Sequence, residues 1–156
     1  MSKVGRLEKV LWSIAFPGFG QLLNGKFLKG LLLIILEVII NAQSKFNKVI
    51  VYSFQGDIHA AIDHANYQWL MFYPCVYLFS IWDAYKDAGG GKTPFSFLPF
   101  VFSAYFVTVG LIYSSSLKVF GVLFGPVFLP MLFLIPGITI GLLLKMALGN
   151  LNIFRT

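Results

Sequence analysis

The chain has 156 residues, of which 58% are hydrophobic and only 12% are charged, and its mean hydropathy is +0.80. This composition excludes an ordinary soluble domain, which needs more polar surface, and indicates a protein whose main partner is the lipid bilayer. The net charge of +6 does not indicate nucleic-acid binding, because the cations lie at the ends of apolar runs and form no basic stripe.

The single cysteine and the motif content narrow the function further. Cys75 lies in an apolar run and has no partner in the chain, which excludes an internal disulfide and a cysteine metal site. No nucleophile elbow, phosphate-binding loop or His-Glu-x-x-His motif occurs in the sequence. We therefore expect no enzymatic activity and no cofactor.

The first apolar run, Val10 to Phe16, is too short to cross a membrane, because a helix rises only about 1.5 Å per residue against a core of about 30 Å. The cations that precede it are typical of a signal peptide. Pro17 and Gly18 follow where a cleavage site should lie, however, and the apolar pattern resumes at once. We expect this segment to be retained.

Residues 10–25 are predicted to form a short helical hairpin that enters the membrane and returns to the same side. Proline stops a helix, whereas glycine permits positive φ and close backbone approach. Amide side chains are suited to bond the backbone groups that a turn at membrane depth leaves open. The predicted turn motif consists of Pro17, Gly18, Gly20, Gln21, Asn24 and Gly25, with no room for a β-carbon at Gly18 or Gly20. A loop at the membrane surface is the alternative.

Four later segments are long enough to cross a membrane: Phe27 to Ala42, Tyr67 to Tyr85, Phe95 to Leu117, and Val119 to Leu144. With a re-entrant hairpin, nine cations share one face and only Lys45, Lys48 and Lys118 lie opposite, whereas a crossing first segment gives six against six. The positive-inside rule favours the first arrangement, with both termini cytoplasmic. The sequence thus predicts a single domain, 1–156, of an all-α integral membrane protein in the cell membrane, with four transmembrane helices and an external amphipathic segment, 43–66.

Two sequence blocks resemble a known family. The pattern Pro17-Gly18-x-Gly20-Gln21, continued by Gly25 and Gly30, and the later Trp82-Asp83 resemble the glycine-rich motif and terminal Trp-Asp of the TM-two domain family, in a variant found in small bacterial membrane proteins. The resemblance covers about half of the chain and implies a helical hairpin without established enzymatic activity or cofactor. The polar stretch 43–66 departs from the family pattern, as does Gln21-Leu22-Leu23-Asn24, where an aromatic pair is common.

Glu37 is the clearest polar residue inside a predicted span. It lies about 15 Å into the helix, and no Lys or Arg lies at a similar depth in another span. A carboxyl there is costly and marks a possible functional site, a proton or cation site supported by Asn41, Gln21 and Asn24. The alternative is a protonated carboxyl with one inter-helix hydrogen bond. Asp83 is a further candidate polar residue, and a solvated pair with Lys86 explains it without any function.

The external segment and the last span carry weaker signals. His59 and Asp63 are four residues apart, but without a third ligand they indicate a solvated helix and no metal site. In the last span, the Gly-x-x-x-Gly pairs Gly121/Gly125 and Gly137/Gly141 predict close helix packing, and three prolines predict a kinked or broken helix.

Taken together, these patterns favour a non-enzymatic multi-pass membrane protein that acts as an assembly, scaffold or accessory component through helix packing. Its expected partners are the bilayer and other membrane proteins or copies of itself. The alternative is a small oligomeric channel or transporter subunit that uses Glu37 and the broken helices for proton, cation or small-solute passage.

Overall fold

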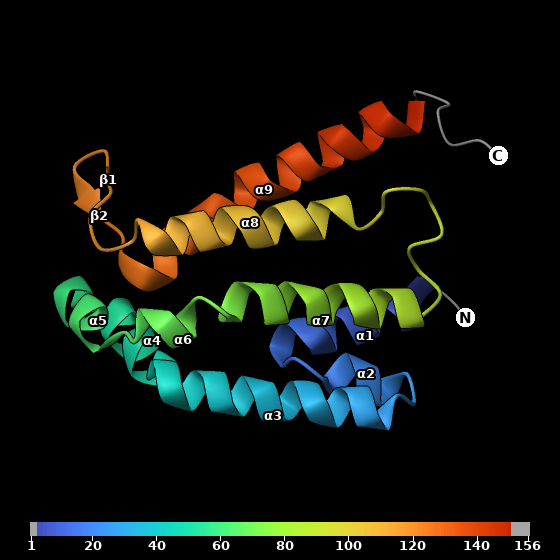
Figure 1. Ribbon diagram of the computed structural model, residues 1–156, viewed down its shortest axis with the longest axis horizontal. Coiled ribbons are helices and arrows are strands. Elements are labelled where there is room, and N and C mark those ends of the chain that lie inside the picture. Colours follow the sequence, from blue (N-terminus) through green and yellow to red (C-terminus); the bar gives the residue numbers. More distant parts are fainter. Residues whose placement is uncertain (1–2, 151–156) are drawn as a thin grey trace.

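The computed structural model describes residues 3–150. It is mostly helical, which confirms the all-α class (Figure 1). The helices are α1 (Lys3–Ala15), α2 (Phe19–Leu23), α3 (Phe27–Ser44), α4 (Phe46–Phe54), α5 (Ile58–His64), α6 (Tyr67–Leu70), α7 (Tyr73–Asp87), α8 (Leu98–Ile112) and α9 (Gly125–Asn150). The short strands β1 (Lys118–Val119) and β2 (Val122–Leu123) form one antiparallel hairpin.

Four helices, α3, α7, α8 and α9, extend along the long axis of the molecule (Figure 1). At one end, α1 and α2 form a small hairpin beside α7 and the start of α3. At the other end lie α4, α5, α6 and the β-hairpin. The most extensive helix contact joins α8 to α9, and α7 links this pair to α1, α2 and α3.

Two helices, α3 and α9, are long and apolar enough to cross a membrane, and only 28% of the most apolar stretch of each is buried inside the structure. α8 is apolar but has only 15 residues. Many large apolar side chains are exposed, among them Leu28 (75%), Ile135 (63%) and Tyr105 (63%). Of the four predicted transmembrane helices, the structure therefore supports two by length and composition.

The span predicted from Tyr67 to Tyr85 is divided into two helices. α6 ends at Leu70, and α7 begins at Tyr73 with Pro74 in its first turn. Proline fits the first turn of a helix but excludes a regular preceding turn, because it lacks an N–H group and its ring meets the carbonyl four residues earlier. The prediction of one continuous helix is corrected for this reason.

The last two predicted spans have different bounds in the structure. α8 begins at Leu98, because the backbone of Phe95 is left-handed (φ 58°). The span predicted to begin at Val119 starts instead with the β-hairpin. Its central residues, Phe120 and Gly121, have φ values of 51° and 81°, as a type I′ turn requires. α9 then continues unbroken from Gly125 to Asn150, although it contains Pro130 and Pro136.

The segment 43–66, predicted as an external amphipathic loop, is folded and packed. α4 and α5 are joined by a turn at Gly56 (φ 84°), and the Asp57 side chain accepts from the Ala60 N–H at the start of α5. Val49, Ala61 and Val127 form a small buried cluster. This polar stretch therefore covers the first turn of α9.

The α8–α9 contact depends on small residues. A β-carbon on Gly137 would lie 2.7 Å from the Ser103 Cα atom, and one on Gly141 would lie 2.5 Å from the Pro99 Cα atom. These glycines let the two backbones approach closely. Gly121 lies in the hairpin turn with open space around it, and Gly125 begins α9 with φ 69°. The pair Gly121/Gly125 is therefore not a helix-packing motif, because only one of its members belongs to a helix.

Candidate functional site

The turn motif lies between α1, α3 and α7. Pro17 is buried, Gly18 has a φ of 102°, and a β-carbon at Gly18 would lie 2.5 Å from the Gly30 carbonyl oxygen of α3. A β-carbon on Gly30 would in turn meet the Leu22 side chain at 2.5 Å. Gly18, which precedes α2, and Gly30 of α3 thus let α3 lie directly against the turn.

Gly20 is crowded for a different reason. It belongs to α2, and its β-carbon would meet the Ser13 hydroxyl, the Lys9 carbonyl oxygen at 2.5 Å and the Ala84 Cβ atom at 2.8 Å. Three segments, α1, α2 and α7, therefore meet at the Cα atom of Gly20. Gly25, by contrast, has open space around it and serves the turn through its φ of 73°.

Gln21 ties this turn to α7. Its side chain is completely buried, and its Nε2 atom donates to the Ser80 carbonyl oxygen at 2.8 Å and to Asp83 Oδ2 at 3.1 Å. The Ser80 hydroxyl accepts from the Gly18 N–H at 3.2 Å. Asn24 Nδ2 donates to the Ala84 carbonyl oxygen at 2.9 Å. The two amides predicted to bond backbone groups at the turn bond mainly to α7.

The structure pairs Asp83 with Lys29, where the sequence suggested Lys86. Lys29 Nζ lies 2.8 Å from Asp83 Oδ1 and 3.0 Å from Asp87 Oδ2. The Lys29 side chain is 49% exposed, whereas that of Asp83 is 12% exposed. The Lys29 ammonium group therefore lies between the nearly buried Asp83 carboxylate and the surroundings of the protein. We call this set the Gln21–Asp83 cluster; it consists of Gln21, Asn24, Lys29, Ser80, Asp83 and Asp87.

Sequence analysis missed three members of the cluster, Lys29, Ser80 and Asp87. One signal could have found Asp87: Asp83 and Asp87 are four residues apart and so lie on one face of α7, where a single cation can reach both. Nothing in the sequence pointed to Lys29 as that cation, because the choice depends on how α3 packs beside α7.

The N-terminal hairpin runs along α7 for about two-thirds of its length. Arg6 donates to the Gly89 carbonyl oxygen at 3.3 Å, and the Tyr77 hydroxyl donates to the Ile14 carbonyl oxygen. α1 is therefore antiparallel to α7, and α2 returns in the opposite direction toward Ala84 (Figure 1). Since Tyr77 precedes Asp87 by ten residues, the hairpin extends about 15 Å from the end of α7.

Glu37 lies apart from this cluster. It is buried (4% exposed), and its Oε1 atom accepts from the Tyr73 hydroxyl at 2.9 Å, while its Oε2 atom has no partner. Asn41 donates to Asn47 at 3.1 Å. None of the three amides predicted to support Glu37, those of Asn41, Gln21 and Asn24, donates a hydrogen bond to it, so the predicted polar site is not joined by hydrogen bonds.

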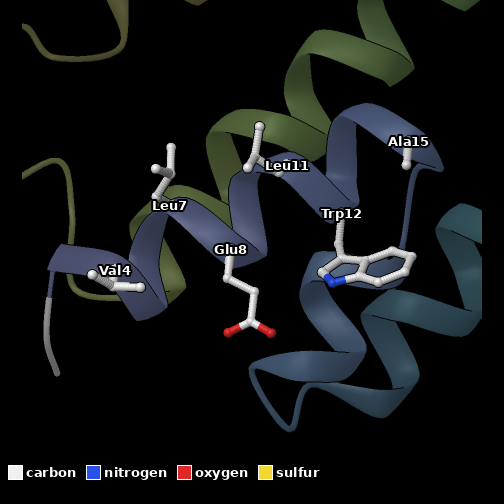
Figure 2. A pocket seen from close by; sticks show the side chains of 6 residues that line it. All are labelled: Val4, Leu7, Glu8, Leu11, Trp12 and Ala15. Atoms are coloured by element: carbon white, nitrogen blue, oxygen red, sulfur yellow. The ribbon is translucent and has the colours of Figure 1, made fainter.

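The outer face of α1 forms a shallow groove of about 410 Å³ (Figure 2). It is lined by Val4, Leu7, Glu8, Leu11, Trp12 and Ala15. Figure 2 shows Leu7 and Leu11 pointing to one side of the helix and Glu8 and Trp12 to the other. With a single carboxylate and mostly apolar walls, the groove has no arrangement of groups for acid–base or nucleophilic chemistry.

No set of three His, Cys, Asp or Glu side chains gathers as metal ligands in the part of the chain that the structure describes. His64 instead bonds the Ala60 carbonyl oxygen at 2.9 Å and lies against the Tyr52 ring. In the Gln21–Asp83 cluster, the donors and acceptors satisfy one another, which suits a structural lock. Comparison of the chain with protein-family models, curated proteins and solved structures finds no match.

Proposed function

We propose that the chain is a multi-pass membrane protein without enzymatic activity that acts as an assembly or scaffold component, through contacts of its exposed helix faces. One observation carries the proposal: the long helices expose apolar side chains along their length, whereas the buried polar side chains of Gln21, Ser80 and Asp83 bond one another and join α2 to α7. Such a surface requires lipid or another apolar partner. In a bilayer, helix faces associate through close packing.

The proposed orientation places both termini in the cytoplasm. What supports it is the distribution of charge: within residues 3–150, eight cations lie at the end of the molecule where α1 begins and α9 ends, and three, Lys45, Lys48 and Lys118, lie at the opposite end (Figure 1). The bias agrees with the positive-inside rule. In this orientation α3, α7, α8 and α9 cross the bilayer, and the α1–α2 hairpin enters the cytoplasmic leaflet and returns.

The proposed likeness to the TM-two domain family is supported by one contact. Its two sequence blocks, which are some sixty residues apart, meet where Gln21 of the first donates to Asp83 of the second at 3.1 Å. A motif whose parts bond each other is suited to fix the fold of a helical hairpin. The likeness adds no enzymatic activity to the proposal.

Cysteine accessibility tests the orientation. In a Cys75→Ser background, single cysteines at Thr93 and Thr156 should be protected from an impermeant thiol reagent in intact cells, whereas cysteines at Gln55 and Ser116 should be labelled. Gln55 is preferred to Asp57, because the Asp57 side chain caps α5. Labelling at Thr93 from outside would overturn the orientation, and release of the protein by an alkaline wash would overturn its insertion into the membrane.

Cross-linking in native membranes, followed by capture in mild detergent and mass spectrometry, tests the scaffold role. The matched variants change two exposed faces: Leu31→Ala/Ile35→Ala on α3 and Met131→Ala/Ile135→Ala on α9. A specific partner or a self-association should be lost in one variant and kept in the other. An unchanged, purely monomeric pattern in the wild type and in both variants would contradict the proposal.

A second candidate function, a small oligomeric channel or transporter subunit, is favoured by the unpartnered Glu37 Oε2 atom alone. A buried carboxyl with a free oxygen could take up a proton or a cation. Purified protein in liposomes should then support proton or cation flux that is lost in Glu37→Gln. Flux no greater than that of empty liposomes would exclude this candidate.

A further inference from the structure

A second groove, larger than that on α1, lies between α7 and α8. Its volume is about 630 Å³. The residues that matter here are Cys75, Phe79 and Trp82 from α7 and Val101, Ala104 and Tyr105 from α8. Several of them are widely exposed, for example Phe79 (57%) and Val101 (53%). The walls are apolar and open to the surroundings, so in water this α7–α8 groove would be poorly solvated.

Aromatic rings mark one end of the groove. The Trp82 ring lies 5.4 Å from the Phe100 ring, and Phe100 also lies beside Tyr85, so aromatic rings join the two helices at the end nearest the 88–97 linker. From Cys75 to Trp82 the groove extends about 10 Å along α7, which is a large part of the depth of one leaflet. An extended alkyl chain fits a groove of this length.

Two cations stand at the linker end of the groove. Lys86 follows Trp82 by four residues on α7 and therefore lies on the same helix face, one turn nearer the end. Gly91 lies against the Trp82 ring, where a β-carbon would meet the ring at 2.7 Å, and Lys92 comes next in the chain. Both lysines are exposed. Asp83 and Asp87 of α7 share the single cation Lys29, so these three residues carry one negative charge, against the two positive charges of Lys86 and Lys92.

We propose that the α7–α8 groove binds an anionic phospholipid, with one acyl chain between Phe79 and Tyr105 and the phosphate beside Lys86 and Lys92. The inference rests on the proposed insertion into the membrane. In the proposed orientation the two lysines and Trp82 lie at the cytoplasmic interface, the level at which aromatic rings and cations meet lipid headgroups. The positive charges of the two lysines select an anionic headgroup, and the apolar walls of the groove hold the acyl chain.

Trp82 itself reports occupancy. The full chain with Trp12→Phe and Trp69→Phe keeps Trp82 as its only tryptophan, and bromine atoms on an acyl chain quench a tryptophan that they contact. In detergent micelles, brominated phosphatidylglycerol should quench Trp82 at a concentration roughly tenfold lower than brominated phosphatidylcholine. Lys86→Gln/Lys92→Gln should remove this difference. The matched control, Lys48→Gln/Lys118→Gln at the opposite end of the molecule, should keep it.

A groove-filling variant tests the acyl-chain site separately. Ala104→Phe should weaken quenching by both lipids, while circular dichroism reports whether the helices are retained. Equal quenching by the two lipids in the wild type, or a preference that survives Lys86→Gln/Lys92→Gln, would overturn the proposal. Absent quenching together with a disulfide between Cys75 residues of two copies would assign the groove to a second copy and also overturn it. These failures leave the protein resistant to an alkaline wash, whereas failure of the proposed insertion releases it from the membrane.

Discussion

Gly20 offers a sharp test of the packing at the turn, because its neighbours leave no space for a side chain. In Gly20→Ala the new methyl group would meet the Lys9 carbonyl oxygen at 2.5 Å and the Ala84 Cβ atom at 2.8 Å. A carbonyl oxygen and the Cβ atom of a neighbouring helix cannot rotate away, so α1 or α7 must shift. Overpacking of this kind costs about 1–3 kcal/mol in the free energy of unfolding.

Gly149→Ala is the matched control. Gly149 is also helical, in α9, but nothing lies within 4 Å of its β-carbon position. Alanine is favoured over glycine in a helix by up to about 1 kcal/mol, so this variant should be neutral or stabilised. At roughly 3 °C per kcal/mol, the melting temperatures of the two variants should differ by about 3–12 °C.

The assay is thermal unfolding of the purified protein in one detergent, followed by circular dichroism and by the temperature at which the protein aggregates. If Gly20→Ala and Gly149→Ala melt within about 2 °C of each other, the close contact of α1, α2 and α7 is refuted.

Three further predictions concern the polar residues. Gln21→Leu should cost about 2–4 kcal/mol, because it removes two donors from buried acceptors; a change in melting temperature no larger than that of Gly149→Ala would contradict this. Lys29→Met should cost no more than about 1 kcal/mol by the same assay, since Lys29 is half exposed. This cost should fall in high salt, which screens an exposed ion pair. A larger loss of stability than that of Gln21→Leu would show that the ion pair, and not the buried amide, is the main contact. Glu37→Gln should keep the melting temperature within a few degrees, because an amide oxygen can accept the Tyr73 bond, whereas failure to fold would show that the carboxyl is needed.

Part of the fold followed from the sequence because the local signals were strong. The apolar run from Phe27 and the proline and glycines before it predicted α3 and a turn at Gly18, and the structure has both. The crowding at Gly18 and Gly20 was also expected from the motif. Prediction was less accurate where the bounds of an element depend on turn chemistry. Pro74 divides the second predicted span, and Phe120 adopts a left-handed backbone that an aromatic residue seldom takes.

By itself, the sequence determined the helical class and the apolar surface, because composition and periodicity act on each segment independently of the others. Only the tertiary structure decided which polar groups meet. Asp83 has a nearby lysine on its own helix, yet it bonds Lys29 and Gln21, because α2 and α3 pack against the inner face of α7. Glu37 was expected beside Gln21 and Asn24, but those amides bond α7 nearer its end, and Glu37 is left with Tyr73. The partner of a polar side chain depends on the rotation and the depth of the neighbouring helix. Both are set by the interlocking of side chains across the helix contact. No single segment of the sequence carries a signal for that interlocking.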